Sequence, residues 1–304
     1  MKKYLQLVLL SLLIIACHQE LEIQRNSFPV CAKPLEGEFF KQNGQTIIQS
    51  PNILQLEDFF VWGGSVIKGK NNKYHMLFSL WECGEKWAPF QDGWLLHSKI
   101  AYAVSDYPNK EFEFQKIVLR GRMLEGDSSA WDAQSVHNPH IKRFNNKYYL
   151  YYTGTRDPGP QPEGSPGENL RKRNRIQQSQ KIGVIEFESF KDLLTGEFKR
   201  PDKPLLVPRT RVKKDNVLNP SPEGTMAKPD NLIVVNPSVV YRLSDEKYLL
   251  YFKGNLWDPH WRGVHGVAIG DSPTGPFIAL DDFVFDIRLE DGKIASAEDP
   301  YVWY

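Results

Sequence analysis

The sequence has few cysteines and no excess of charge, and each absence excludes a class of protein. Only three of the 304 residues are cysteines, and none lies in a CxxC motif or a Cys/His cluster, so a zinc site has no support. Lysine and arginine total 38 against 37 for aspartate and glutamate, which predicts no nucleic-acid or polyanion partner. The sequence also lacks a glycine-rich phosphate loop, a GxSxG elbow and an HExxH motif, so it gives no sign of the chemistries that those motifs carry.

The one long apolar run lies at the N-terminus. Residues 5–16 follow two lysines and are too few to remain as a membrane-spanning helix. The ending Ile14-Ile15-Ala16-Cys17 looks like a lipobox, in which Cys17 becomes the lipidated first residue after cleavage. An ordinary secretory signal or an uncleaved anchor is the alternative. We therefore predict a lipoprotein signal peptide over 1–16 and a lipid-anchored protein of the cell envelope, in the periplasm or on the outer-membrane surface.

The two remaining cysteines fit an oxidising compartment without depending on it. Cys31 and Cys83 are the only candidates for a disulfide bond once Cys17 is lipidated. Two unpaired thiols are the alternative, and the sequence leaves both open.

One pattern recurs along the chain. Each copy is a polar turn followed by Lys-Tyr and an aromatic or aliphatic strand, with a further short apolar strand downstream. The copies begin at Asn71, Asn145 and Asp245. Related elements that contain proline begin at Asn138, Asn236 and Glu298. The pattern predicts a repeated unit of four strands, in which the Lys-Tyr strand is buried on both faces.

Four strands repeated radially form the blade of a β-propeller. We therefore expect an all-β protein in which residues 51–304 form the blades, after an N-terminal linker with first strands at 17–50. The last proline-containing element begins only a few residues before Tyr304, so we expect a propeller that is incomplete at the C-terminus. Surplus residues between copies predict long loops. The longest, 157–180, is either a binding loop on one rim or a solvated insertion.

Asn-Pro or Asp-Pro elements followed by Lys-Tyr-aromatic strands resemble the five-bladed propeller superfamily of glycoside hydrolase family 43 and its relatives. These relatives are the arabinanase, xylosidase, levansucrase and invertase type enzymes. The resemblance covers roughly residues 55–304 and includes the segments 61–69 and 131–139. It implies five blades and an inverting glycosidase with carboxylates at the propeller centre. It implies no required cofactor, although some relatives hold a calcium ion on the axis.

The superfamily's chemistry needs a base, an acid and an orienting aspartate, and this sequence departs from the pattern. Gly63 occupies the place of the base, so Asp58 is the nearest substitute, with Glu57 as its rival. Asp132 follows a tryptophan that could desolvate it. A turn or capping role is the alternative for Asp58, and a turn aspartate paired with a lysine or an arginine is the alternative for Asp132. Glu298 is the candidate general acid.

Polar and aromatic residues at equivalent strand ends are the candidate sugar-binding residues. They are Trp62, His97, His137, Asn138, Asn236, Lys253, His265 and Asp299. Arg156 lies at a similar strand end. Further tryptophans could stack on sugar rings or pack between blades, namely Trp81, Trp94, Trp131 and Trp257.

The predicted function is hydrolysis of a plant or algal polysaccharide or oligosaccharide, with release of a terminal sugar. A non-catalytic carbohydrate-binding propeller is the main alternative, because Gly63, Asn138 and Asn236 stand where acids are expected. A phosphorylase is a third possibility, with Lys253 and Arg262 as weak phosphate ligands.

Overall fold

The computed structural model describes residues 52–165, 167–209, 228–257 and 261–303, together with the backbone of two short paired strands, β1 (Gln42–Asn43) and β2 (Thr46–Ile47). The predicted signal peptide, the lipidation site Cys17 and the possible disulfide partner Cys31 lie outside these residues. Cys83 has a free thiol in the described part of the chain. No helix of the described residues combines the length and apolar character needed to cross a membrane.

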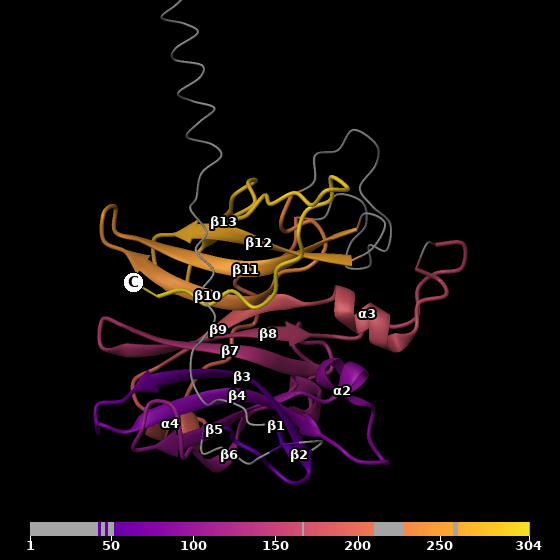
Figure 1. The fold of residues 1–304 in the computed structure, drawn as a ribbon. Helices are drawn as coiled ribbons and strands as arrows, with labels where there is room; N and C mark the ends of the chain where they lie inside the picture. Colours follow the sequence, from indigo (N-terminus) through magenta and orange to yellow (C-terminus); the bar gives the residue numbers. More distant parts are fainter. Residues whose placement is uncertain are drawn as a thin grey trace, which may run out of the picture. The chain divides into compact units, whose positions relative to one another are not determined.

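Residues 51–304 form one compact unit built almost entirely from β-strands, as the sequence predicted (Figure 1). The strands are β3 (Phe59–Lys68), β4 (Tyr74–Glu82), β5 (Lys99–Ser105), β6 (Glu113–Leu119), β7 (Ser135–Phe144), β8 (Lys147–Thr155), β9 (Lys181–Phe187), β10 (Val235–Arg242), β11 (Lys247–Trp257), β12 (Trp261–Gly270) and β13 (Phe277–Ala279). Short helices lie between them: α2 (Phe90–Leu96), the 3₁₀ turn η1 (Arg122–Glu125), α3 (Lys172–Gln178) and α4 (Phe190–Thr195).

The strands form three antiparallel meanders in chain order. Strands β3–β6 make the first sheet, β7–β9 the second and β10–β13 the third. The first strand of each sheet packs beside the first strand of the next, so β7 lies between β3 and β10 (Figure 1). Successive blades of a propeller have this arrangement. The described sheets do not close into a ring, and five blades remain a prediction.

The Lys-Tyr strand β8 is buried on both faces because the first sheet covers one face of the second sheet and the third sheet covers the other. Along β8, Tyr148 and Leu150 pack into a core cluster with the first sheet, whereas Tyr149 and Tyr151 pack into a cluster with the third. Successive side chains of a strand point to opposite faces, so one strand contributes to both cores. The strand predicted after residue 145 is thereby confirmed.

The first strand of each sheet carries the same irregularity. Two of its residues lie opposite a single residue of the next strand, so the pairing register shifts by one residue, and the first of the two has a positive φ: 60° at Gly63, 47° at Asn138 and 52° at Asn236. Glycine and asparagine tolerate this left-handed conformation better than other residues. Asp299 also adopts this left-handed conformation, with a φ of 38°. The described chain thus holds four equivalent positions, which we call the axial positions.

The second sheet differs from the predicted unit. It has three strands rather than four, and only an isolated bridge between Ile182 and Leu206 marks the place of a fourth. The helices were not predicted. Helix α3 lies within the loop expected over 157–180, so this segment is partly helical in the structure.

Candidate functional site

A pocket of about 190 Å³ lies where the first strands of the three sheets meet. It is lined by Trp62, Ser79, Trp81, Phe90, Trp94, His137, Asn138, Gln177, Gln180, Ile233, Val235, Asn236, Lys253, Asn255, Glu298 and Asp299. We call it the central pocket. Three of the four axial positions are in its lining, so the repeated backbone irregularity is what aims these side chains into it.

The axial side chains contact one another. The Nδ2 atoms of Asn138 and Asn236 both donate to Oδ1 of Asp299, the first at 3.4 Å. Hydroxyl groups of neighbouring strands hold the two asparagine backbones: Asn138 N–H donates to Ser79 Oγ at 2.8 Å, and Asn236 N–H donates to Thr153 Oγ1 at 3.1 Å. Gly63 lies beside them, and a β-carbon there would be 3.6 Å from Asn138 Nδ2. One carboxylate therefore sits among two amides and a glycine.

The electrostatics of the pocket centre on the two adjacent acids. The pKa of Asp299 is raised above its ordinary value, because the surrounding protein desolvates the carboxylate and Glu298 adds a like charge. Glu298 Oε2 is ion-paired with Lys253 Nζ at 2.5 Å, and its backbone carbonyl contacts Nε2 of His265 at 3.1 Å. The two acids are thus in different environments, one next to amides and the other next to an ammonium group.

Three residues that line the central pocket each hold a buried polar atom with no hydrogen-bond partner among the described residues. These atoms are Trp81 Nε1, His137 Nε2 and Asn255 Oδ1, on side chains that are at most 5 % exposed. An unsatisfied buried polar atom is costly, so these atoms indicate that the pocket is built for a ligand or water.

The protonation of His137 follows from its neighbours. Burial lowers its pKa to about 4, so the ring is neutral near pH 7. Asn138 donates to Asp299 through Nδ2, so its Oδ1 is the acceptor for Nδ1 of His137, 2.7 Å away. His137 Nε2 is therefore an acceptor. With the Trp81 donor and the Asn255 acceptor, the pocket offers the mixture that sugar hydroxyls match, since a hydroxyl both donates and accepts.

Aromatic side chains form one wall of the pocket. Phe90 and Trp94 stand one turn apart on α2, and Phe90 contacts Trp62 and Trp81 with ring centroids 5.7 Å and 5.2 Å apart. Trp94 meets His137 edge-on at 5.2 Å. Trp62 is 48 % exposed, so its ring is open to a ligand. The wall supplies apolar ring surface to the pocket that also holds the carboxylates.

Most of the residues that the sequence singled out for binding come together here, with one of the three catalytic candidates, Glu298. The central pocket contains Trp62, His137, Asn138, Asn236, Lys253, Glu298 and Asp299. His265 lies directly behind Glu298. His97 lies outside the pocket lining, where its ring contacts Trp87 edge-on at 5.4 Å.

Asp58 is not in the pocket lining. It precedes β3 in an exposed turn, and its backbone carbonyl accepts the N–H of Cys83 at 3.0 Å. Its rival Glu57 is also exposed and outside the lining. The observed geometry gives Asp58 the turn role that the sequence left as the alternative.

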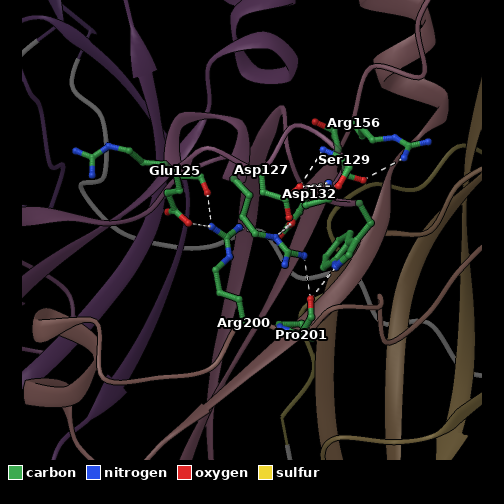
Figure 2. A network of polar contacts seen from close by, with 12 residues as sticks. Glu125, Asp127, Ser129, Asp132, Arg156, Arg200 and Pro201 are labelled. Carbon is green, nitrogen blue, oxygen red and sulfur yellow. Dashed lines mark hydrogen bonds and ion pairs between the residues drawn. The ribbon is translucent and has the colours of Figure 1, made fainter.

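Asp132 is also away from the central pocket, in a buried ion-pair network (Figure 2). Its side chain is fully buried and accepts from Arg122 Nε at 2.5 Å, Arg200 Nη2 at 2.6 Å and Tyr152 Oη at 2.8 Å. A carboxylate held by two guanidinium groups is unsuited to proton transfer. The structure gives Asp132 the role that the sequence left as the alternative, an aspartate paired with arginine, because folding brings Arg122 and Arg200 against its side chain.

Several pocket residues had no signal in the sequence. Gln177 and Gln180 enter from the end of α3, and Asn255 from β11. Phe90 enters from α2, and its spacing of four residues from Trp94 was the available sign of a shared helix face. Of the tryptophans considered for stacking, Trp81 and Trp94 line the pocket, whereas Trp131 packs against Tyr152 at 5.5 Å.

The axial calcium that the family resemblance allows can be tested against the donor set. The axial positions hold one carboxylate and two amides, and the described residues contain no cluster of three or more His, Cys, Asp or Glu side chains. Calcium favours several carboxylate oxygens. These described residues do not fit such a site.

No protein-family model and no curated protein matches the sequence. Solved structures do resemble the fold. The family 117 glycoside hydrolase Zg3597 from Zobellia galactanivorans has a TM-score of 0.49 at 19 % identity, over 73 % of this chain and 56 % of its own. CoXyl43, a family 43 β-xylosidase/α-arabinofuranosidase from a compost metagenome, has a TM-score of 0.46 at 13 % sequence identity, over 81 % of this chain and 64 % of its own. The β-xylosidase RS223 has a TM-score of 0.45 at 15 % sequence identity, over 80 % of this chain and 64 % of its own.

The structural neighbours are thus glycoside hydrolases of the kind that the sequence resembles, at low sequence identity. The chain spans less than two thirds of the length of each of these three proteins.

Proposed function

We propose that this protein is a glycoside hydrolase of the five-bladed propeller type that acts at the central pocket on a plant or algal oligosaccharide. The observation that carries the proposal is the pairing of Asp299, whose pKa is raised, with Glu298 in a pocket that has an aromatic wall and unpartnered polar atoms. Pockets with perturbed carboxyl groups and a few convergent polar groups are typical of active sites. The small volume supports binding of one terminal sugar.

Each acid has a role that suits its surroundings. Asp299 is the general acid, because its raised pKa favours the protonated form that donates to the leaving glycosidic oxygen. Glu298, ion-paired with Lys253, accepts a proton from the water that attacks the anomeric carbon. The glycosidic bond breaks as the new carbon–oxygen bond forms, and inversion requires the water to attack from the opposite face. These roles differ from the sequence-based expectation, in which Glu298 was the acid.

The neutral side chains orient the sugar. Trp62 and its aromatic neighbours stack on the ring, while His137 Nε2 accepts a hydroxyl proton and Trp81 Nε1 donates. Asn138 and Asn236 hold the Asp299 carboxyl group in place. Substrate binding would satisfy the buried atoms that lack partners in the described residues.

The test is hydrolysis of a panel of plant and algal oligosaccharides, followed by chromatography of the products. We expect release of a monosaccharide and a loss of about 10²–10⁴-fold in rate in Asp299→Asn, the range that general acid catalysis contributes. Asparagine already occupies two axial positions, so this variant keeps the left-handed backbone. The matched control is Asp282→Asn, an exposed aspartate outside the pocket, and it should keep full activity.

A non-catalytic carbohydrate-binding protein is the second candidate. The observation in its favour is that three of the four axial positions hold Gly63, Asn138 and Asn236 rather than acids. Binding of panel members without any turnover by the unaltered chain would establish this candidate in place of the hydrolase.

The lipid anchor belongs to the same proposal. Cleavage before Cys17 and lipidation of its thiol would hold the protein at the cell envelope, where glycans arrive. Mass spectrometry of the mature N-terminus tests this, and an unmodified Cys17 or cleavage at another residue would contradict it.

A further inference from the structure

A second cleft, of about 400 Å³, lies beside the central pocket. It is lined by Arg122, Asp127, Ser129, Ala130, Trp131, Arg156, Pro158, Ser179, Lys181 and Asp202. We call it the outer cleft. None of these residues lines the central pocket, so the two are separate cavities.

The two cavities share one wall. Gln177 and Gln180 face the central pocket, whereas Ser179 and Lys181 face the outer cleft. All four belong to the end of α3 and the start of β9. The two cavities therefore lie on either side of this one segment.

The outer cleft presents hydrogen-bonding groups that the protein does not fully use. Arg156 donates through Nη1 to the Ser129 carbonyl at 3.2 Å, while the hydrogen bonds described for Arg156 involve neither Nε nor Nη2. Asp127 accepts three hydrogen bonds from residues 129 and 130, all through Oδ1. Asp202 is exposed at the cleft. The guanidinium fork and the carboxylates offer paired donors and paired acceptors, which match neighbouring hydroxyl groups.

The charges of the cleft and its support cancel. The lining has three cations, Arg122, Arg156 and Lys181, against Asp127 and Asp202. The network next to it adds the buried pair of Arg200 and Asp132, and the exposed Glu125 is ion-paired with Arg200 at 3.0 Å, which gives four cations and four carboxylates in all (Figure 2). A balanced set favours a neutral, hydroxyl-rich ligand over a phosphate or sulfate group.

The buried network also fixes the cleft in position. Asp132 pairs with Arg122, which lines the cleft, and with Arg200 behind it, while Arg122 and Trp131 both donate to the carbonyl of Pro201, at 2.9 Å and 3.2 Å (Figure 2). This network ties residues 122–132 to residues 200–201. The cleft is therefore a preformed site rather than a gap between loops, and preformed sites lose less entropy on binding.

We propose that the outer cleft is a second sugar-binding subsite, which holds a neutral sugar residue further along the oligosaccharide whose end enters the central pocket. The inference rests on the proposed function for its choice of ligand. Two linked subsites raise the affinity for long chains, because binding at the first places the rest of the chain at high local concentration near the second.

The test is calorimetric titration of xylo- and arabino-oligosaccharides of increasing length into the full chain carrying Asp299→Asn, which prevents hydrolysis under the proposed mechanism. We expect affinity to rise about tenfold or more once the chain is long enough to reach the cleft. Arg156→Met and Asp202→Asn should each remove this gain and leave the affinity for the shortest ligand unchanged. The matched controls are Arg120→Met and Asp282→Asn, at exposed residues that line neither cavity, and they should keep the gain.

The outcomes separate the two proposals. Absence of any gain with length, or a gain that persists in both cleft variants, overturns the subsite even if the unaltered chain hydrolyses the shortest substrates. A gain that millimolar sulfate abolishes overturns the neutral-sugar assignment. A gain lost only in the cleft variants supports the subsite, and it does so whether or not the unaltered chain shows turnover.

Discussion

A single backbone conformation decides which side chains meet in the central pocket. Gly63, Asn138, Asn236 and Asp299 all adopt positive φ, and the last three point polar groups into the pocket. An asparagine tolerates this conformation but cannot titrate, whereas an aspartate can. The chemical character of each axial position therefore depends on one atom of one side chain.

Buried histidines make the stability of the protein depend on pH. His140 is 2 % exposed, and burial lowers its pKa to about 3. In the unfolded chain the pKa is about 6.5, so below that pH the unfolded state binds a proton that the folded state does not. The contribution is fully present above pH 6.5 and is lost as the pH falls. We expect His140 alone to remove about 2 kcal/mol of the unfolding free energy between pH 8 and pH 5.

The measurement is urea unfolding of the unaltered chain and of His140→Gln at both pH values. The difference in unfolding free energy between the two proteins should shrink by this amount at pH 5. A difference that is the same at both pH values would show that His140 is protonated in the folded state.

At the scale of elements, short helices in the loops add side chains to the pocket and to the core that the strands form. Helix α2 brings the aromatic wall, α3 separates the two cavities, and α4 covers a core cluster with Phe190 and Leu193. Helices of six or seven residues are unstable alone, so each depends on packing against the sheets, and α4 depends in addition on a capping box.

The cap of α4 provides a test of this dependence. Ser189 Oγ donates to Asp192 Oδ1 at 2.8 Å and accepts from its N–H at 3.3 Å, while Asp192 Oδ2 accepts from Ser189 N–H at 2.9 Å. Ser189→Ala removes the hydroxyl and should lower the unfolding free energy by about 1 kcal/mol. Ser189→Thr keeps the hydroxyl and should cost much less. Equal losses in the two variants, measured by chemical denaturation, would contradict a capping role.

The strands could be predicted from the sequence because the repeat consists of local sequence patterns. The Lys-Tyr strands, the Asn-Pro elements and the Asn145-Asn146 turn all depend on neighbouring residues, and both asparagines of that turn have positive φ as a two-residue hairpin requires. The pocket residues at these elements followed from the same patterns. The short helices and Asp132 could not be predicted, because their positions depend on contacts between distant segments, such as Asp132 with Arg200.

At the scale of the whole molecule, hydroxyl–amide bonds join neighbouring segments at equivalent places. Ser65 Oγ of the first sheet accepts the N–H of Ile141 in the second at 3.1 Å, and Ser238 Oγ of the third accepts the N–H of Val302 at 2.9 Å. Both serines are at most 1 % exposed. Lys142 Nζ adds a bond to the Val302 carbonyl at 3.2 Å, so the last described segment crosses two sheets.

These bonds allow a test of whether the sheets unfold together. Ser65→Ala leaves the buried N–H of Ile141 unpaired and should cost about 1–3 kcal/mol, whereas Ser238→Ala leaves the half-buried N–H of Val302 unpaired and should cost less. They share no partner, so in one cooperative unit the double variant should lose the sum within about 0.5 kcal/mol. Ser128→Ala, at an exposed serine, is the control and should change little. Two separate thermal transitions in the double variant would show that the sheets unfold independently.

The equivalence of the axial positions has an evolutionary consequence. Since Asn138, Asn236 and Asp299 share this backbone conformation, an exchange of asparagine and aspartate among them keeps the scaffold, and one nucleotide substitution turns either asparagine codon into an aspartate codon. An acid deleted from one blade can be regained on another without loss of the fold along the way. In descendants of such a protein, the reactive carboxylate can move to a different sequence position while its location in space stays within a single pocket.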